Sequence, residues 1–453
     1  MNRDLTKGPV TRSMLLFAIP MILGDLLQQC YNIADTLIVG QFLGRNALAA
    51  VGSAFTLMTF LTSIILGLCM GSGALFSMRF GQRDEKALCE NLCASFFFIA
   101  LVTLLLNVLS FACLDGLRAF LRVPAEVWGD MRRYLLVIFM GIPAVFLYNY
   151  FSSFLRAIGN SVIPLAFLAV SALLNIALDP LFIFTFKLGI SGAAIATLIS
   201  QCISFSILLY FFVSGKSITK LSIRHVATHM GVYLQILSIG FPSFCRQGLA
   251  SISTVALNIA AANYGDAAVA AMSIVGRIFF LVLAILIGFG HGFQPVVGYN
   301  YGAKRYGRVH EAFFFCVKAG TVFLACAGIA GFIFAPEILG LFRKEDAAVL
   351  AIGTAALRAQ CAALPFQPLS VLSNMLFQSV GKPVQATFVA ATRQGIYFIP
   401  LIIILPCFFG LRGVELTQCI SDFLSFLSCI PLLILFFRDL RRREMQEGSC
   451  ETH

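Results

Sequence analysis

Residues 13–40 read SMLLFAIPMILGDLLQQCYNIADTLIVG, and this stretch decides the class of fold. It is longer than the roughly 20 residues that an α-helix needs to cross a bilayer. Four of its polar side chains share one helix face, within an arc of about 80°; they are Asp25, Gln28, Asn32 and Asp35. A charge at mid-bilayer costs at least about 2.5 kcal/mol. The stretch therefore predicts a membrane-spanning helix whose polar face lies against protein.

The composition of the whole chain agrees with this first helix. The chain has 453 residues, of which 59% are hydrophobic and only 12% are charged, and its mean hydropathy is +0.91. Soluble proteins carry roughly 25% charged residues. The composition excludes a soluble enzyme, a nucleic-acid-binding module and a disordered chain, and it predicts an integral membrane protein.

Further apolar runs divide the chain into regular spans. Twelve are long enough to cross a bilayer: 13–40, 47–78, 88–114, 130–155, 161–185, 190–213, 233–262, 268–299, 311–335, 347–377, 384–408 and 413–437. We therefore predict an all-α integral membrane protein. The polar segment 214–232 is expected to be a cytoplasmic linker between an N-terminal lobe, 1–213, with spans 1–6, and a C-terminal lobe, 233–437, with spans 7–12. Residues 438–453 are expected to form a cytoplasmic tail.

The basic residues indicate the orientation of the spans. With the N-terminus in the cytoplasm, the loops on that side receive twice as many Lys and Arg residues as the loops on the other side. Cytoplasmic loops of membrane proteins carry such an excess. Both termini are therefore predicted to be cytoplasmic, and the net charge of +11 needs no nucleic-acid partner to explain it.

The two lobes resemble each other in sequence. Glycine pairs recur at one constant spacing along the chain: Gly44/Gly265, Gly67/Gly288, Gly71/Gly292, Gly81/Gly302, Gly189/Gly410 and Gly192/Gly413. Because each lobe has an even number of spans, the two share one orientation in the membrane. Twelve transmembrane helices in two pseudo-symmetric six-helix lobes are an arrangement typical of secondary transporters, with substrate between the lobes.

A second polar group accompanies the first span. Asn175 and Asp179 are four residues apart and share a helix face, and Thr197 lies in the next span. If they converge with Asp35, their oxygen atoms suit a small hard cation such as Na⁺, or a shared proton. Each residue alone could equally be a hydrogen-bonded structural group.

The second lobe has a different charge pattern. In the interior of its spans lie five basic residues and two acids: Arg246, Arg277, Lys318, Arg358, Arg393, Glu415 and Asp422. Either the acids neutralise the bases or a basic patch contacts substrate. Polar and helix-bending residues of several spans are candidates for a substrate cavity or gate: Pro20, Asp25, Gln28, Asn32, Gln201, Arg246, Gln247, Asn258 and Gln378.

The chain resembles the multidrug and toxic compound extrusion (MATE) family along its whole length. The first-lobe stretches that carry the resemblance are AIPMILGDLLQQCYNIADTLIVGQFLG, RAIGNSVIP, LLNIALDPLFIF and LGISGAAIATLIS. The second-lobe stretches are IGFPSFCRQGLASI and VVGYNYGAKRYGRV. The resemblance implies twelve helices in two lobes and export of amphipathic, often cationic, drugs in exchange for Na⁺ or H⁺.

The resemblance also implies roles for individual residues. The first-lobe cation site of one branch of the family maps onto Asp35, Asn175, Asp179 and Thr197, which would be metal ligands if the coupling ion is Na⁺. The family's bending proline matches Pro20, and a glutamine of its drug cavity matches Gln28. Another branch uses acids on spans 7 and 10; these spans have none here, so a second-lobe cation site of that kind is not expected.

We therefore predict a secondary active multidrug antiporter working by alternating access. It is expected to be a monomer in the plasma membrane, in contact with lipids and with drugs or metabolites, and to need no cofactor beyond the coupling ion, H⁺ or Na⁺. Two alternatives remain, a lipid-linked precursor flippase of the same superfamily and a membrane-embedded transferase. No nucleophile–base pattern, phosphate loop or metal-ligand spacing supports an enzyme.

Overall fold

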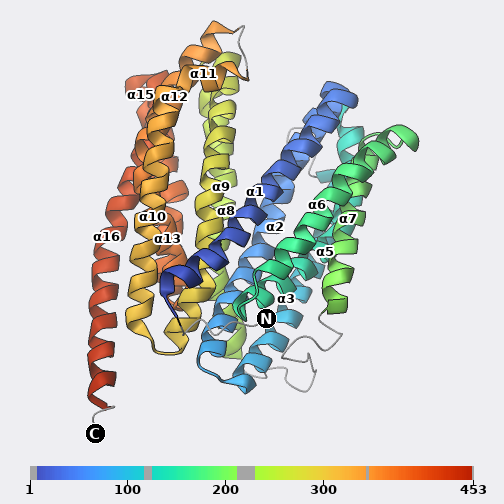
Figure 1. Ribbon diagram of the computed structural model, residues 1–453. Helices are drawn as coiled ribbons and strands as arrows, with labels where there is room; N and C mark the ends of the chain where they lie inside the picture. The colour runs from blue at the N-terminus through green and yellow to red at the C-terminus, as the bar shows by residue number, and fades with distance from the viewer. Residues whose placement is uncertain (1–7, 117–124, 212–229, 343–345, 451–453) are drawn as a thin grey trace. The chain divides into compact units, whose positions relative to one another are not determined.

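The computed structural model describes residues 8–116, 125–211, 230–342 and 346–450, and all regular secondary structure in these ranges is helical. The helices of the first half are α1 (Val10–Phe42), α2 (Gly44–Gly81), α3 (Glu85–Ala112), α5 (Ala125–Ala157), α6 (Val162–Pro180), the π-helical turn η1 (Leu181–Thr185) and α7 (Ile190–Phe211). Within this half, α5, α6 and α7 pack side by side (Figure 1).

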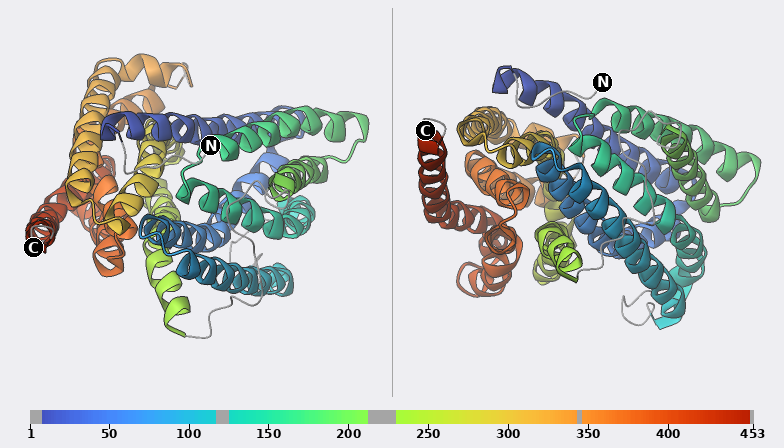
Figure 2. Two further views of the ribbon diagram at one scale, coloured as in Figure 1. Left: turned by 60° about the horizontal axis from the view of Figure 1, so that its bottom comes forward. Right: turned by 90° about the horizontal axis from the view of Figure 1, so that it is seen from below.

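The second half follows the same plan. Its helices are α8 (Met230–Ala262), α9 (Asp266–Gly302), α10 (Tyr306–Ile333), α11 (Ala335–Gly340), α12 (Ala347–Ala363), η4 (Leu364–Phe366), α13 (Gln367–Ser379), α14 (Pro383–Ala391), η5 (Thr392–Ile396), α15 (Phe398–Phe409) and α16 (Leu411–Cys450). In this half α10, α12 and α16 pack against one another, as Figure 2 shows from two further directions. The predicted all-α fold class is confirmed.

Eleven segments of the described chain are long and apolar enough to cross a membrane. The predicted spans 347–377 and 384–408 are each interrupted, the first by the 3₁₀ turn η4 and the second by the π-helical turn η5. The predicted seventh span coincides with α8, which has 33 residues. It is not among the eleven, and it carries the adjacent polar residues Arg246 and Gln247 near its middle. The last span continues as one helix through most of the expected tail.

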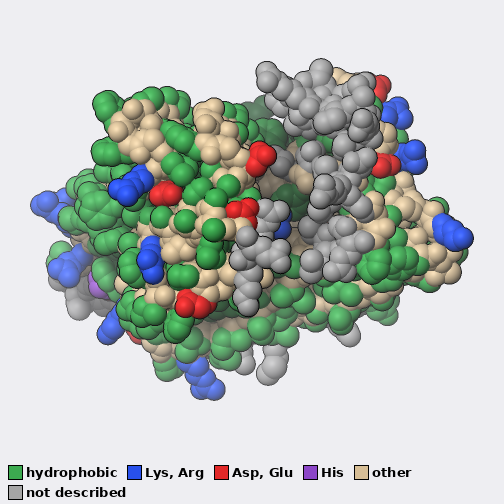
Figure 3. Space-filling view, turned by 90° about the horizontal axis from the view of Figure 1, so that it is seen from above, with side chains coloured by type: hydrophobic (Ala, Val, Ile, Leu, Met, Phe, Trp, Pro, Cys, Tyr) green, Lys and Arg blue, Asp and Glu red, His purple; other side chains and the backbone are tan. Residues whose placement is uncertain are grey.

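The outer surfaces of the helices suit a lipid environment. On α3, the large side chains Leu101, Leu104, Leu105 and Val108 are exposed by 55%, 60%, 61% and 58%. Figure 3, which looks from above onto one end of the helices, shows hydrophobic side chains over parts of that face and charged groups in small separate places. Exposed apolar patches of this extent mark a surface that is covered by something other than water.

Close contacts divide the described chain into two units, with boundaries inside α1 and α8. Unit 1 contains Leu23–Gly240, and unit 2 contains Leu5–Ile22 together with Phe241–His453. Each boundary lies close to a helix-interior proline, Pro20 in α1 and Pro242 in α8. The sequence-based limits, 1–213 and 233–437, follow the linker instead, and that division stays a prediction. Most of the linker, 214–229, lies outside the described residues.

Glycines explain why the first part of each proline-containing helix belongs with the opposite half of the sequence. In unit 1, a Cβ on Gly71 of α2 would lie only 2.4 Å from the backbone nitrogen of Gly240 in α8. In unit 2, a Cβ on Gly292 of α9 would lie 2.7 Å from the Cα of Ala18 in α1. Only glycine permits helices to approach so closely. The two contacts are related by the repeat, since Gly71 pairs with Gly292, and Ala18 and Gly240 each lie just before the proline of their helix.

The backbone confirms the internal repeat at its turns. Gly189 and Gly410 both have a φ of +58°, and each precedes a helix. Arg83 and Lys304, which pair at the same spacing as the glycines, have φ values of 59° and 60°, which side-chain-bearing residues rarely adopt. Equal strained conformations at equivalent positions are the mark of a duplicated backbone.

The close contact between Gly71 and Gly240 can be tested by substitution, and a second glycine of α2, Gly52, provides the control. Gly71→Ala should destabilise the protein by about 1–3 kcal/mol, because the new methyl group has no space. Gly52→Ala in the same helix should be neutral or stabilising, since a Cβ there meets nothing within 4 Å and alanine is the better helix former. Thermal unfolding of the purified protein in detergent measures both. Equal melting temperatures for the two variants would contradict the close helix contact.

Candidate functional site

The polar side chains of α6 and α7 meet in the interior of unit 1. Asn175 and Asp179 lie one turn apart on α6 and are 1% and 0% exposed. Asp179 is followed by Pro180 and by the π-helical turn η1, so the regular helix ends directly after the carboxylate. Thr197 faces them from α7, where its hydroxyl also donates to the carbonyl of Ala193 at 3.1 Å.

The Asn175 amide connects the two helices. With its nitrogen toward Asp179, it donates to Oδ2 of that carboxyl at 3.1 Å. Its oxygen then accepts from the backbone N–H of Thr197 at 3.2 Å. The hydroxyl of Tyr31 on α1 lies 3.4 Å from the Thr197 hydroxyl and brings the first helix into the network. All four residues belong to unit 1.

Asp35 completes the group from α1. Its carboxyl group lies close enough to that of Asp179 for the two to interact electrostatically, and its buried Oδ1 atom finds no donor among the described residues. The sequence-predicted set of Asp35, Asn175, Asp179 and Thr197 is therefore brought together. Two neighbouring buried carboxylates cannot both be ionised without compensation, so this pair favours a bound proton or a cation between its members.

This arrangement can hold one positive charge. Two carboxyl groups, one amide and two hydroxyl groups offer oxygen atoms without sulfur or imidazole, which suits a proton or a small hard cation. No group of three His, Cys, Asp or Glu side chains in the described parts of the chain could hold a metal ion. A sodium ion at this place would therefore depend on amide and hydroxyl oxygens in addition to the two carboxylates.

The remaining polar residues of α1 and α7 in unit 1 lie beside this group in the sequence. The Gln28 amide donates to Asn32 Oδ1 at 3.4 Å, so the two form a local pair. Gln201, one turn after Thr197 on α7, is partly buried.

Asp25 has a basic counterpart that the sequence did not reveal, because Arg156 at the end of α5 lies within electrostatic range of it. Arg156 also donates to the Ser153 hydroxyl at 2.9 Å.

The other predicted cavity or gating residues belong to unit 2. Pro20 lies inside α1 on the unit 2 side of the boundary. On α8, Arg246 donates to Asn374 Oδ1 at 3.2 Å, Gln247 is partly buried and Asn258 is exposed. Gln378 is 0% exposed. Its amide donates to the Ser243 hydroxyl at 2.8 Å and accepts from Gln294 at 2.9 Å, so it lies within the packed interior of the unit.

The charges of the second half are neutralised in at least one place. Arg393 of η5 and Asp422 of α16 form an ion pair with 2.8 Å between Nε and Oδ1. The prediction that the acids of the second half neutralise its bases is thus confirmed for Arg393 and Asp422. Glu415, on the same helix, is close to Arg412 instead.

Tyr31 and Arg156 are site residues that sequence reasoning missed. Tyr31 precedes Asp35 by four residues, and this spacing places the two on one helix face, so a search for hydroxyl groups at helical spacing would have found it. Arg156 lies between the predicted spans 130–155 and 161–185 in the sequence, so polarity inside spans does not select it. It occupies the last turn of α5 and is within electrostatic range of Asp25 on α1.

Comparisons with known proteins relate this fold to transporters. A family model described as MatE matches residues 20–181 and 242–404, two segments that each begin at the helix-interior proline of their half, as the repeat requires. Multidrug export protein MepA of Staphylococcus aureus is 29% identical over 440 residues, covering 96% of this chain and 95% of its own length. The protein of the same name in Staphylococcus saprophyticus is 26% identical over 449 residues, 98% of each chain.

Solved structures share the whole fold. A multidrug resistance MATE family transporter of the MOP superfamily, in an outward-facing conformation, matches with a TM-score of 0.88 and 25% identity over 97% of this chain and 98% of its own. A MOP superfamily transporter from Pyrococcus furiosus matches with a TM-score of 0.91 and 24% identity, over 96% and 98% of the two chains.

The proximity of Asp25 and Arg156 predicts a stability effect. Asp25→Asn should lower the free energy of unfolding by about 1–2 kcal/mol, because a partly buried guanidinium loses its through-space attraction to a carboxylate. Asp115→Asn is the matched control, since Asp115 is 81% exposed in its ion pair with Arg132 and such surface pairs contribute about 0–1 kcal/mol. Thermal unfolding compares the two. A larger loss at Asp115 would contradict the assignment of Arg156 to Asp25.

Proposed function

Because the chain belongs to the MatE family, we propose that it exports amphipathic, often cationic, small molecules across the plasma membrane in exchange for H⁺ or Na⁺. The family, the fold and the many apolar helices make it a multi-pass membrane transporter of the multidrug export class. The exchange of drug for an ion, the identity of that ion, the cytoplasmic termini and a monomeric state are parts of the proposal.

The paired carboxyl groups of Asp35 and Asp179 are the single observation that carries the exchange. They are held in the interior of unit 1, where the low dielectric makes an uncompensated pair of negative charges unfavourable. One H⁺ or Na⁺ bound between them restores the balance. The Asn175 amide and the Thr197 and Tyr31 hydroxyls would orient the carboxyl oxygens around it.

Ion entry can supply the energy for export. One charge that crosses 100 mV is worth about 2.3 kcal/mol, or roughly a fiftyfold gradient of drug. This energy is usable only if the ion binds more tightly in one conformation than in the other. Asp35 is on α1 and Asp179 is on α6, so a change in the course of α1 would separate the two carboxyl groups. Pro20 removes a backbone hydrogen bond within α1 and provides a place for such a bend.

The proposal predicts that ion-driven export needs both carboxyl groups. Asp35→Asn and Asp179→Asn should each lower dye efflux at least about tenfold, since each variant removes a charged ligand worth about 1.5–3 kcal/mol. The measurement is dye transport by proteoliposomes or everted vesicles, with H⁺ and Na⁺ gradients imposed separately. Asp115→Asn, an exposed acid outside the site, should transport at the rate of the unmodified protein.

Two outcomes would contradict the proposal in different ways. Full efflux by both site variants would show that the coupling ion binds elsewhere. If neither gradient drives export of any dye by the unmodified protein, multidrug exchange is wrong and transport of a lipid-linked precursor becomes the better explanation.

A further inference from the structure

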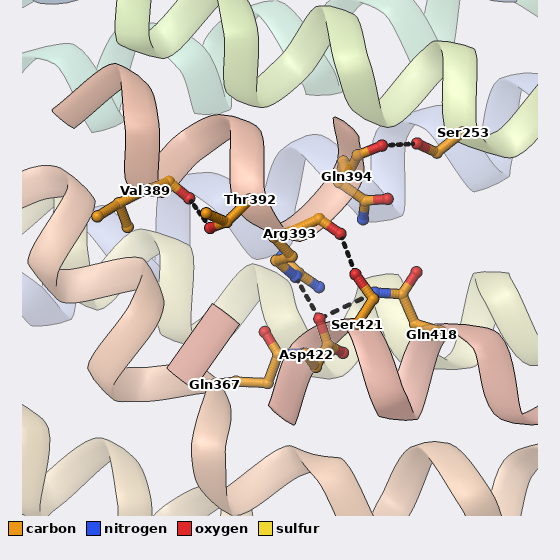
Figure 4. A network of polar contacts seen from close by, with 9 residues as sticks. All are labelled: Ser253, Gln367, Val389, Thr392, Arg393, Gln394, Gln418, Ser421 and Asp422. Atoms are coloured by element: carbon orange, nitrogen blue, oxygen red, sulfur yellow. Dashed lines mark hydrogen bonds and ion pairs between the residues drawn. The ribbon is translucent and has the colours of Figure 1, made fainter. Parts of the chain in front are cut away.

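A buried acid in unit 2, Asp422, has its counter-charge supplied by the chain itself. Its side chain is 1% exposed, and that of its ion-pair partner Arg393 is 15% exposed. Figure 4 shows the guanidinium of Arg393 pointing from the π-helical turn η5 toward the carboxyl group on α16. The amide nitrogens of Gln418, at 2.9 Å, and of Gln367 also donate to this carboxyl group.

The turn that carries Arg393 is fixed on two sides. A π-helical turn leaves backbone carbonyls outside the regular hydrogen-bond ladder. The Ser421 hydroxyl of α16 donates to the carbonyl of Arg393 at 2.5 Å, and the Ser253 hydroxyl of α8 donates to the carbonyl of Gln394 at 2.5 Å (Figure 4). The guanidinium is therefore presented to Asp422 by a held backbone and not by a freely moving loop.

The repeat places this pair on the counterparts of the helices that hold the unit 1 site. Gly189 before α7 and Gly410 before α16 are equivalent and have the same φ of +58°. The spacing between these two glycines also relates Thr197 to Gln418 and Gln201 to Asp422. In unit 2 the buried carboxyl group lies on the helix that follows this glycine, whereas in unit 1 it lies on α6, which packs against that helix. In unit 1 it faces a second carboxyl group, whereas in unit 2 it faces a guanidinium.

We propose that Arg393 is the resident cation of a second acidic site, at Asp422 in unit 2, so that of these two sites only the one in unit 1 responds to the ion. The guanidinium occupies the place that a proton or monovalent cation would otherwise take. Because it is tethered and keeps its charge at all physiological pH values, Asp422 remains balanced whatever the ion gradient. The protein then carries one exchangeable ion site instead of two.

Other charged groups near Asp422 do not provide this balance. The interactions that reach its carboxyl group in the described chain come from Arg393, Gln418 and Gln367, and the Cys419 thiol lies nearby on α16 itself. Of the bases on the helices packed against α16, Lys318 of α10 is exposed, and Arg358 of α12 donates to the Phe332 carbonyl at 3.2 Å. Arg393 is the cation that the geometry assigns to Asp422.

The test removes the resident cation and asks whether a free one replaces it. The background is Asp35→Asn with Asp179→Asn, which silences the unit 1 site. When Arg393→Met is added to this background, the melting temperature should rise by about 2–4 °C on replacement of choline chloride by NaCl at constant ionic strength. A mildly acidic buffer should raise it by a similar amount. A hundredfold excess of ligand over its dissociation constant gives a shift of about this size for a chain of 453 residues.

Two matched variants decide the origin of such a shift. Arg393→Met combined with Asp422→Asn should respond to neither Na⁺ nor acid, because no carboxylate remains to be balanced. Arg393→Lys, which keeps a cation, should also be insensitive. If Arg393→Met can be purified only together with Asp422→Asn, the requirement for a cation at Asp422 is supported as well.

The proposal is overturned if Arg393→Met responds to Na⁺ and acid no more than its background does, since Arg393 would then serve packing alone. It is overturned equally if the response persists after Asp422→Asn. The inference concerns the number of ion sites in the proposed exchange, but the readout is stability and not transport. The inference about Arg393 can therefore be wrong while the proposed export is correct, and the efflux experiment can fail while the inference about Arg393 is correct.

Discussion

Two carboxyl groups that share one buried site impose the constraint on which the rest of unit 1 depends. Asp35 and Asp179 interact directly, and a pair of negative charges in that place is stable only with a positive charge between them. The neighbouring groups serve this pair. Asn175 fixes the orientation of the Asp179 carboxyl, Thr197 fixes Asn175, and Tyr31 ties Thr197 to the helix that carries Asp35. Loading and release of the charge are thereby linked to the position of α1.

The two units show two solutions to one electrostatic problem. The buried acids occupy different places in the duplicated backbone, since Asp179 lies on α6, which packs against α7, and Asp422 lies on α16, the counterpart of α7. In unit 2, the acid is balanced within the chain by Arg393, with additional donors from Gln367 and Gln418. Such a pair is permanent, since removing either member would leave an uncompensated charge. In the proposed exchange, the balance in unit 1 comes from an ion outside the chain. The asymmetry is one of side chains only, because the glycine turns and the close helix contacts are repeated.

Much of this could be predicted from the sequence because membrane burial leaves a strong pattern. The apolar runs predicted the spans, the glycine spacing predicted the repeat, and polarity inside spans selected the four residues that meet in unit 1. Other features depend on tertiary contacts that no local pattern encodes. The unit boundaries inside α1 and α8 follow from backbone approach at Gly71 and Gly292, and Arg156 reaches Asp25 from a helix end. Gln378 resembled a cavity residue in sequence, but its partners Ser243 and Gln294 enclose it.

The central claim is that Asp35 and Asp179 together hold one exchangeable positive charge. Infrared spectroscopy of the purified protein tests it directly, because a protonated carboxyl group has its own C=O stretching band. The account predicts such a band without Na⁺ in neutral buffer, its absence from the variant that combines Asp35→Asn with Asp179→Asn, and its loss on addition of Na⁺ if that ion competes for the site. A spectrum identical in the two proteins under all of these conditions would contradict the account.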